Sequence, residues 1–430
     1  MSLKTTLSYG SALFLSLVGP THADWVPLAG APFQPGRLED VFFVTDDVGW
    51  TIYFGGHFYR TENGGATWED VPNVPFALYR TLCAVSPSHG WIGTLSAGTP
   101  LLETTDGGDT WSSVSALEGV VPGLCGMWVV DEQTVYAVGK VSGPATIVKT
   151  TNAGADWIVT DFADRALGLI DCVFFSPDSG IAVGYGPPDG TRRAAVYGTN
   201  DGGQTWETRH VGSRIDEWCW KVSFPSRQIG YASIERFDNE QWILKTTDGG
   251  QTWTEIHIGT TLEQQGIGFL DDLTGWVGGR GSLEGDPGYT QRTTDGGTTW
   301  EEDPWGVNVN AFCRSPGGDA YAAGQTIYRY LNPTDVPGDT DLTETVLYTS
   351  RNPFGDAVAL RYHRATNGPS RLVVLSAAGE QVALLVNRFE SVGPHEAVWT
   401  PDPSSVPSGI YFAVLEVSEG TYVRKLHLLR

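Results

Sequence analysis

The sequence predicts an all-β protein in which a seven-bladed β-propeller is followed by an immunoglobulin-like β-sandwich. Three observations lead to this prediction. The 430 residues include 54 Gly and 16 Trp but only 2 Met, a composition typical of short strands and tight turns, and no long stretch has a helical apolar period. An octet ending in Trp recurs along residues 24–331. Strand-like segments then fill residues 344–430.

The N-terminus has the pattern of a secretory signal. Lys4 supplies the positive charge, residues 12–18 form a short apolar run, and Thr21-His22-Ala23 is a small-residue cleavage site. We therefore expect residues 1–23 to be a signal peptide that is removed after Ala23; the alternative is an ordinary disordered N-terminus. The apolar run is too short to span a bilayer, and no later segment predicts an integral membrane helix.

The octet occurs six times, first as "TENGGATW" from Thr61 and then as "TTDGGDTW" from Thr104. Consecutive copies are 43 to 49 residues apart, and they end at Trp68, Trp111, Trp157, Trp206, Trp253 and Trp300. A period of this length indicates a radial array whose unit is one four-stranded sheet.

A second repeated segment, a polar turn followed by a short apolar strand, precedes the octets. It occurs seven times, for example as "SPSHGWIG" from Ser86 and "DDLTGWVGG" from Asp271. The last unit ends without an octet, and "DWVPLAG" from Asp24 resembles the strand that follows one. We therefore expect the first strand to complete the last blade, so that a closed ring leaves no exposed sheet edges.

The octet itself is predicted to be a turn. Its Asp or Asn can accept hydrogen bonds from backbone N–H groups, and Gly249 and Gly250 tolerate positive φ. We expect the closing Trp to bury its ring against the same blade. The Asp and Asn positions are Asn63, Asp106, Asn152, Asp201, Asp248 and Asp295. A calcium loop is the alternative, but the further carboxylates and terminal Glu of such a loop are missing, so no metal site is predicted.

The octets resemble Asp-boxes, also called bacterial neuraminidase repeats. Together with strands such as "LEDVFFVTDDVGW" from Leu38, they resemble the propellers of the photosystem II assembly and stability factors. The resemblance covers residues 24–331 and implies the fold more than the function, because Asp-boxes occur on proteins of many activities.

A separate module follows the repeats. Residues 332–343 are polar and acidic and contain Pro, which predicts a linker. Segments such as "RLVVLSAAG" from Arg371 and "GIYFAVLEV" from Gly409 predict a β-sandwich over residues 344–430.

This module resembles the type A sorting domain of the type IX secretion system and the related flagellar hook-capping-like immunoglobulin fold. The matching pieces are Asn352-Pro353-Phe354, the turn around Gly379, Trp399, "SGIYF" from Ser408 and Arg424-Lys425-Leu426. The resemblance implies export across the outer membrane, followed by removal of the module or by anchoring at the cell surface. The alternative is a generic spacer domain of a surface protein.

The net charge and the cysteines limit which partners and metals the sequence predicts. The net charge of −23 disfavours nucleic acid and acidic membranes. None of the cysteines forms a CxxC pair, which argues against a zinc site. Their odd number leaves at least one thiol unpaired unless a second chain pairs with it, and small buried packing residues are the simplest interpretation. The five are Cys83, Cys125, Cys172, Cys219 and Cys313.

One group of residues is a candidate binding site. Four arginines precede innermost strands, where a propeller gathers side chains around one mouth of its central channel. They are Arg37, Arg80, Arg165 and Arg214, with Tyr79, Trp218 and Trp220 as neighbouring aromatic residues. Such a mouth could bind a carboxylate or an acidic peptide. The alternative is that the arginines pair with local acids, which are Glu39, Asp164 and Asp216.

No catalytic residue is predicted. The Arg-Ile-Pro motif of sialidases, the GxSxG motif and the phosphate-binding GxxxxGK[ST] motif do not occur in the sequence. We therefore expect a monomeric, non-enzymatic binding protein without a cofactor, secreted or held at the cell surface, with a protein or glycan of the cell envelope as partner. A sialidase-type glycoside hydrolase and a structural surface-layer component are the alternatives.

Overall fold

The structure is a computed structural model that describes residues 25–28, 30–236, 240–259, 262–281, 290–303, 305–331, 346–349 and 357–428. The predicted signal peptide and linker lie outside the described residues. One compact unit spans Asp24–Leu331, and Asn332–Arg430 belong to another. The two units are treated separately below.

The first unit contains seven four-stranded antiparallel sheets. The first three, in chain order, are β2–β5 (Leu38–Phe43, Gly49–Tyr53, His57–Thr61, Glu69–Asp70), β6–β9 (Tyr79–Ala84, Gly90–Thr94, Leu101–Thr104, Ser112–Ser113) and β10–β13 (Gly126–Val129, Val135–Gly139, Thr146–Thr150, Ile158–Asp161). The next three are β14–β17 (Gly168–Phe174, Gly180–Gly186, Arg193–Thr199, Glu207–Val211), β18–β21 (Trp218–Ser223, Gly230–Glu235, Gln241–Thr246, Thr254–Gly259) and β22–β25 (Leu262–Phe269, Gly275–Gly281, Thr290–Thr293, Glu301–Asp303).

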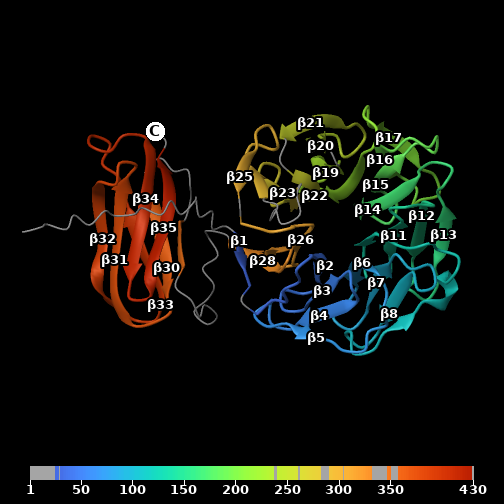
Figure 1. Cartoon of the computed structure of the whole chain (residues 1–430), viewed down its shortest axis with the longest axis horizontal. Coiled ribbons are helices and arrows are strands. Elements are labelled where there is room, and N and C mark those ends of the chain that lie inside the picture. Colours follow the sequence, from blue (N-terminus) through green and yellow to red (C-terminus); the bar gives the residue numbers. More distant parts are fainter. Residues whose placement is uncertain are drawn as a thin grey trace, which may run out of the picture. The chain divides into compact units, whose positions relative to one another are not determined.

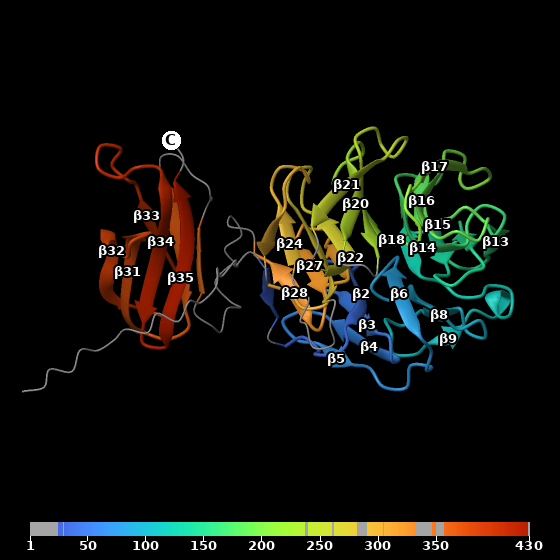
Figure 2. The same cartoon turned by 45° about the horizontal axis from the view of Figure 1, so that its top comes forward.

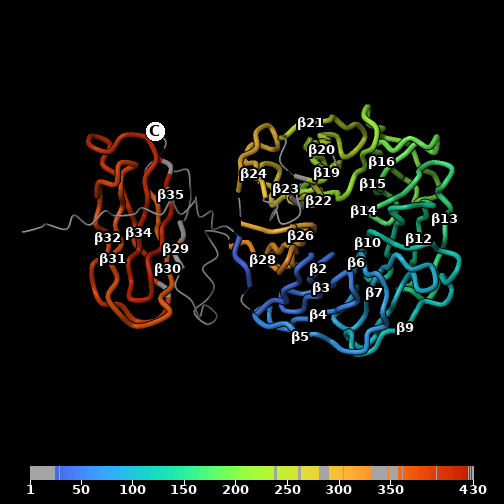
Figure 3. The backbone as a smooth tube through the Cα atoms, in the orientation of Figure 1, coloured from blue at the N-terminus to red at the C-terminus, as the bar shows by residue number. Residues whose placement is uncertain are grey.

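The seventh sheet joins the two ends of the unit. It combines β26 (Ala311–Arg314), β27 (Ala320–Ala323) and β28 (Ile327–Tyr330) with β1 (Trp25–Pro27), and Trp25 pairs with Tyr330. The seven sheets surround a common centre (Figure 1), and the chain visits them in order around the ring (Figure 3). In the described residues the only helical segment is a 3-10 turn at Ser115–Leu117, so the predicted all-β class with repeated four-stranded sheets is confirmed.

The ring has two faces that carry different connections, because neighbouring strands are antiparallel. We call one the octet face; it holds the octets and the turns between the first and second strands of each sheet, such as residues 44–48. The other we call the loop face. It holds the hairpins between second and third strands, such as residues 54–56, and the segments between sheets, such as residues 71–78. The tilted view shows strands running between the two faces (Figure 2).

Most octet tryptophans pack against their own blade, as expected. Their rings lie edge-on to a phenylalanine of the same blade in four pairs, which are Trp68 with Phe43, Trp206 with Phe174, Trp253 with Phe224 and Trp300 with Phe269. Two tryptophans also join neighbouring sheets. Trp111, in the second sheet, lies edge-on to Phe58 of the first sheet, with ring centroids 5.1 Å apart. Trp157, in the third sheet, lies 5.9 Å from Trp91 of the second.

Hydrogen bonds reinforce these contacts between sheets. Side chains of one sheet donate to the carbonyl of the first octet glycine of the next sheet. The pairs are Tyr321 with Gly64 (3.1 Å), Arg60 with Gly107 (3.2 Å), Tyr136 with Gly202 (3.0 Å) and Tyr231 with Gly296 (3.0 Å). The octets thus stabilise the ring as well as their own turns.

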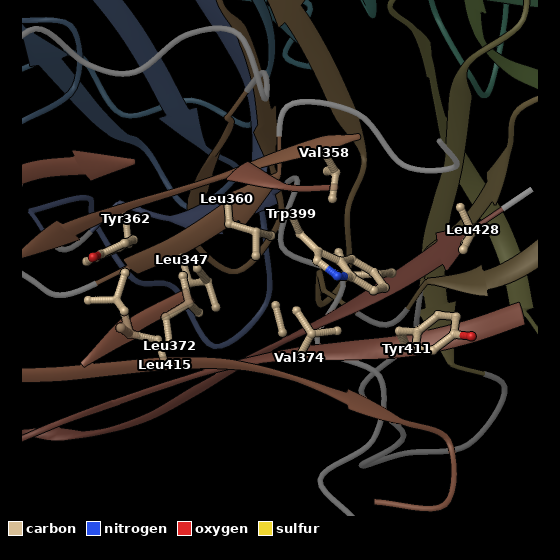
Figure 4. Close-up of a cluster of buried hydrophobic side chains, with 13 residues drawn as sticks. Leu347, Val358, Leu360, Tyr362, Leu372, Val374, Trp399, Tyr411, Leu415 and Leu428 are labelled. Atoms are coloured by element: carbon tan, nitrogen blue, oxygen red, sulfur yellow. The ribbon is translucent and has the colours of Figure 1, made fainter. Parts of the chain in front are cut away.

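The C-terminal unit consists of two sheets around one core. One contains β29 (Val346–Thr349), β30 (Val358–Arg364) and β33 (Gly393–Trp399); the other contains β31 (Gly368–Ser376), β32 (Gln381–Glu390), β34 (Gly409–Val417) and β35 (Gly420–Leu428). Side chains from both sheets meet around Trp399, whose ring centroid is 5.2 Å from that of Tyr411 (Figure 4). This single apolar cluster explains the alternating pattern of the segment.

Candidate functional site

Two of the predicted arginines meet at the centre of the ring. The guanidinium groups of Arg37 and Arg80 both pair with the buried carboxylate of Glu39, Arg37 through Nε at 3.1 Å. Arg80 is itself buried, and its Cζ lies 4.4 Å from the ring centroid of Trp220. Burial alone would raise the pKa of Glu39, but the charges of Arg37 and Arg80 lower it below its ordinary value. These two arginines are therefore used by the fold, as the alternative interpretation expected.

Trp220 links three sheets at this end of the channel. It belongs to β18 in the fifth sheet, and its Nε1 donates to Oδ1 of Asn310 just before the seventh sheet (2.7 Å). Arg80 packs on the same ring from the second sheet. One buried side chain thus contacts elements from three separate sheets across the axis. Trp218 lies in the same apolar cluster and donates to Glu235 (2.7 Å).

The other two predicted arginines have partners elsewhere. Nη1 of Arg165 donates to the carbonyl of Trp206 (2.7 Å), and its Nε is 3.9 Å from Asp164. Arg214 pairs with Glu217 (2.9 Å) and Glu255 (2.6 Å) rather than with Asp216. The structure brings together Arg37, Arg80, Trp218 and Trp220, but it gives Arg165 and Arg214 partners of their own. Local partners such as Glu39 for Arg37 could be expected from the sequence, whereas distant partners such as Glu39 for Arg80 and Glu255 for Arg214 could not.

Sequence reasoning missed a set of exposed apolar side chains on the loop face. Phe76 is 77% exposed and lies over the hairpin that carries Phe54, since a Cβ built on Gly56 would meet its ring at 2.8 Å. Further exposed members of the face are Phe33, Leu78, Val120 and Ile215. On the octet face, the large apolar side chain exposed in a turn is Leu273. Loop residues without a periodic pattern give no signal of their exposure in a sequence.

Each octet is held by the same short hydrogen-bond pattern. In the second octet, Oγ1 of Thr104 donates to Asp106 (2.8 Å) and accepts from the N–H of Gly108 (2.9 Å), while Asp106 Oδ1 accepts from the N–H of Thr110 (2.9 Å). Asn63 and Asn152 accept the corresponding amide bond at 2.9 Å. The predicted structural role of these six positions agrees with this geometry, including the positive φ of Gly249 and Gly250.

The lowered pKa values of the octet carboxylates lead us to expect that the protein loses stability in acid. The Thr110 hydroxyl lowers the pKa of Asp106 to about 2. At Asp248 the effect of burial, which alone would raise the pKa, is outweighed by the Thr252 hydroxyl and the pKa is also about 2. Because the folded values lie below the ordinary 3.8, the stabilisation is complete above that pH and is lost as the pH falls toward about 2. Urea unfolding measured across this range should show the decline.

The Asp106→Asn variant is the control for this acid effect. Asparagine accepts the same amide bond, as Asn63 and Asn152 do, but it does not titrate. The variant should therefore lose less stability than the unmodified protein between pH 3.8 and about 2. An identical pH dependence in the two proteins would contradict the role given to Asp106.

The third octet contains a strained residue. Ala153 has φ of 52° at the position where the other five octets have glycine. The left-handed conformation is unfavourable for a residue with a Cβ, so Ala153→Gly should raise the free energy of unfolding by about 0.5 to 1 kcal/mol. Ala155→Gly, two residues further in the same turn, should lower it by a similar amount. Denaturant titration of both variants tests this, and a lower free energy of unfolding for Ala153→Gly would contradict it.

Other classes of site are not found in the described residues. Within them, no group of three or more His, Cys, Asp or Glu side chains is placed to hold a metal ion. The part of the chain described here also includes no helix long and apolar enough to cross a bilayer. All five cysteines are free, and four of them are buried.

Comparison with known proteins supports a β-propeller. No family model matches the chain. The chain is similar to YCF48 from Cyanidioschyzon merolae, with a TM-score of 0.53 and 19% identity over 72% of this chain and 99% of that one. It is also similar to YCF48 bound to D1 peptide, with a TM-score of 0.52 and 20% identity over 73% of this chain and 97% of that one. A third similar structure is virginiamycin B lyase from Staphylococcus aureus, with a TM-score of 0.53 and 11% identity over 71% of this chain and 97% of that one. The shared fold therefore does not by itself separate binding proteins from enzymes.

A curated protein gives the more particular similarity. The chain is 26% identical to the chloroplastic photosystem II stability/assembly factor HCF136 of Oryza sativa subsp. japonica over 290 aligned residues. The alignment covers 59% of this chain and 67% of that protein. This similarity is compatible with a non-enzymatic binding protein.

Proposed function

We propose that this protein is a secreted or cell-surface binding protein without enzymatic activity. In this proposal the first unit is a closed, seven-bladed Asp-box propeller, the C-terminal unit is an immunoglobulin-like sorting domain, and a polypeptide partner docks on the loop face. The observation that carries the proposal is the group of exposed apolar side chains there, because patches of this kind mark interaction sites on soluble proteins.

The chemistry of the partner follows from the residues that it would contact. Phe54 and Phe76 offer aromatic surface on adjacent connections. Elsewhere on the loop face, Arg165 keeps a half-exposed side chain although it is 3.9 Å from Asp164. A segment with apolar side chains beside a carboxylate complements this face. One similar protein, YCF48, has been solved with a D1 peptide, which supports a polypeptide rather than a glycan as the partner class.

Export is proposed from the sequence. Residues 1–23 have the signal pattern, and the C-terminal module resembles type IX sorting domains. Antibodies against the first unit should detect the protein in the medium or on intact cells. They should detect a product shorter than residues 24–430 if the module is removed. Retention of all the protein inside the cell would contradict this part of the proposal.

Crosslinking on intact cells followed by mass spectrometry tests the docking surface. The Phe54→Ser/Phe76→Ser double variant should lose at least about 90% of the captured partner, because burial of a large apolar side chain contributes about 1.5 to 3 kcal/mol. Leu273→Ser is the matched control, since Leu273 is 58% exposed on the octet face. Equal capture by all three proteins would overturn the assignment of the loop face.

A further inference from the structure

The central channel contains a cavity that is separate from the loop face. Its volume is about 620 Å³, within the range of about 300 to 1,000 Å³ that is usual for small-molecule sites. The innermost strands and the turns that follow them line it, for example Phe42 with Val44 and Ser223 with Pro225. These turns belong to the octet face, so the cavity opens there. Trp220, Arg80 and Asn310 do not line it.

Aromatic residues form part of the cavity wall. Phe42, Trp128, Phe224, Phe269 and Phe312 come from five different sheets and line the cavity. Trp128 keeps 38% of its surface exposed, which is unusual for a side chain of this size on an innermost strand. An apolar molecule entering the cavity would cover this surface and gain stacking contacts.

Four acidic residues line the cavity, Asp40, Asp131, Glu132 and Asp171, and the fold uses the carboxylates of Asp40 and Asp171 to join sheets. Asp40 Oδ2 accepts from the hydroxyl of Thr81 (3.0 Å) and the N–H of Leu82 (3.1 Å), and Asp171 Oδ2 accepts from the N–H of Val222 (3.0 Å). Each of these two acids therefore ties its own sheet to the next one. Burial raises the pKa of Asp171, and the nearby charge of Lys221 opposes this rise.

Lys221 is not held by hydrogen bonds of this kind, although its charge acts on the carboxyls of Asp171 and Glu39. It lines the cavity from β18, and its side chain is half-buried. Its backbone N–H donates to Ser233 Oγ (3.0 Å), whereas its ammonium forms no hydrogen bond or ion pair with any of the described residues. An ammonium group has three donors and no acceptor, so Lys221 offers donors to a ligand in the cavity.

We propose that the channel cavity binds a small organic molecule with an aromatic or branched apolar body and one oxygen acceptor, a carboxylate or a carbonyl, which takes a hydrogen bond from Lys221. The apolar body lies against Trp128 and the phenylalanine rings. This site is independent of partner docking, since it opens on the octet face.

Calorimetric titration of the full chain with three naphthalene compounds tests the proposal. Naphthoate and naphthamide carry an oxygen acceptor, whereas naphthylmethylamine has the same ring system with a cation. The first two should bind at least about tenfold more tightly than the amine, because a hydrogen bond to a charged group contributes about 1.5 to 3 kcal/mol, and 1.4 kcal/mol corresponds to tenfold. The difference between naphthoate and naphthamide shows whether a charged or a neutral acceptor is preferred.

Three variants connect the binding to the cavity. Lys221→Met should weaken naphthoate and naphthamide about tenfold or more without weakening the amine, and Ser223→Trp should abolish binding by filling the cavity. Phe76→Ser, on the loop face, should bind all three compounds as the unmodified protein does. The proposal would be overturned if the amine bound more tightly than the other two compounds. It would also be overturned if Lys221→Met bound naphthoate and naphthamide as tightly as the unmodified protein, or if Ser223→Trp still bound them. Loss of partner capture by Phe54→Ser/Phe76→Ser would concern the loop face and would leave the proposed cavity site intact.

Discussion

Trp25→Ala is expected to lower the free energy of unfolding by about 3 to 5 kcal/mol, the usual range for removing a buried tryptophan ring. Trp25 is 3% exposed, its ring stacks on that of Trp305 at 4.7 Å, and it lies edge-on to Trp276 at 5.4 Å. It also anchors β1 to β28. The substitution therefore leaves a cavity at the point where the two ends of the ring are joined.

Guanidinium titration followed by tryptophan fluorescence measures this effect. Phe76→Ala is the control, because Phe76 is aromatic but largely exposed, and it should change the free energy of unfolding by no more than about 0.5 kcal/mol. If Trp25→Ala were no more destabilising than Phe76→Ala, the N-terminal strand would not close the ring energetically.

Arg80→Met should destabilise the protein by about 3 kcal/mol at neutral pH. Removal of one partner from a buried ion pair leaves the other charge insufficiently compensated, and Glu39 would keep Arg37 as its ion-pair partner. The pKa of Glu39, lowered in the native protein, would then rise. The deficit of the variant should therefore shrink as the pH falls and Glu39 becomes protonated.

Unfolding titrations at neutral and mildly acidic pH measure both effects. The double variant Arg80→Met/Glu39→Leu removes both charges and should recover part of the lost stability, since apolar replacements of a buried pair are often tolerated. A double variant less stable than Arg80→Met, with a deficit independent of pH, would contradict the importance of this pair.

The candidate site shows where sequence reasoning stops. Arg37 and Arg80 could be placed near the axis because each precedes an innermost strand. Their shared partner Glu39 lies 41 residues from Arg80, and the bond from Trp220 to Asn310 spans 90 residues. Periodicity fixes the position of a residue within its sheet, but pairing across the axis depends on how seven sheets meet.

The sequence by itself determined the class of fold, the repeated sheets and the octet turns. Each turn is closed by bonds within eight residues, such as those of Thr104, Asp106 and Thr110, so local chemistry is sufficient to specify it. Only the tertiary structure decided that Trp220 joins sheets across the axis, that Lys221 lines the channel cavity and that Phe76 remains exposed. These properties depend on burial and on contacts between residues distant in the chain, which the spacing of residues along a sequence does not encode.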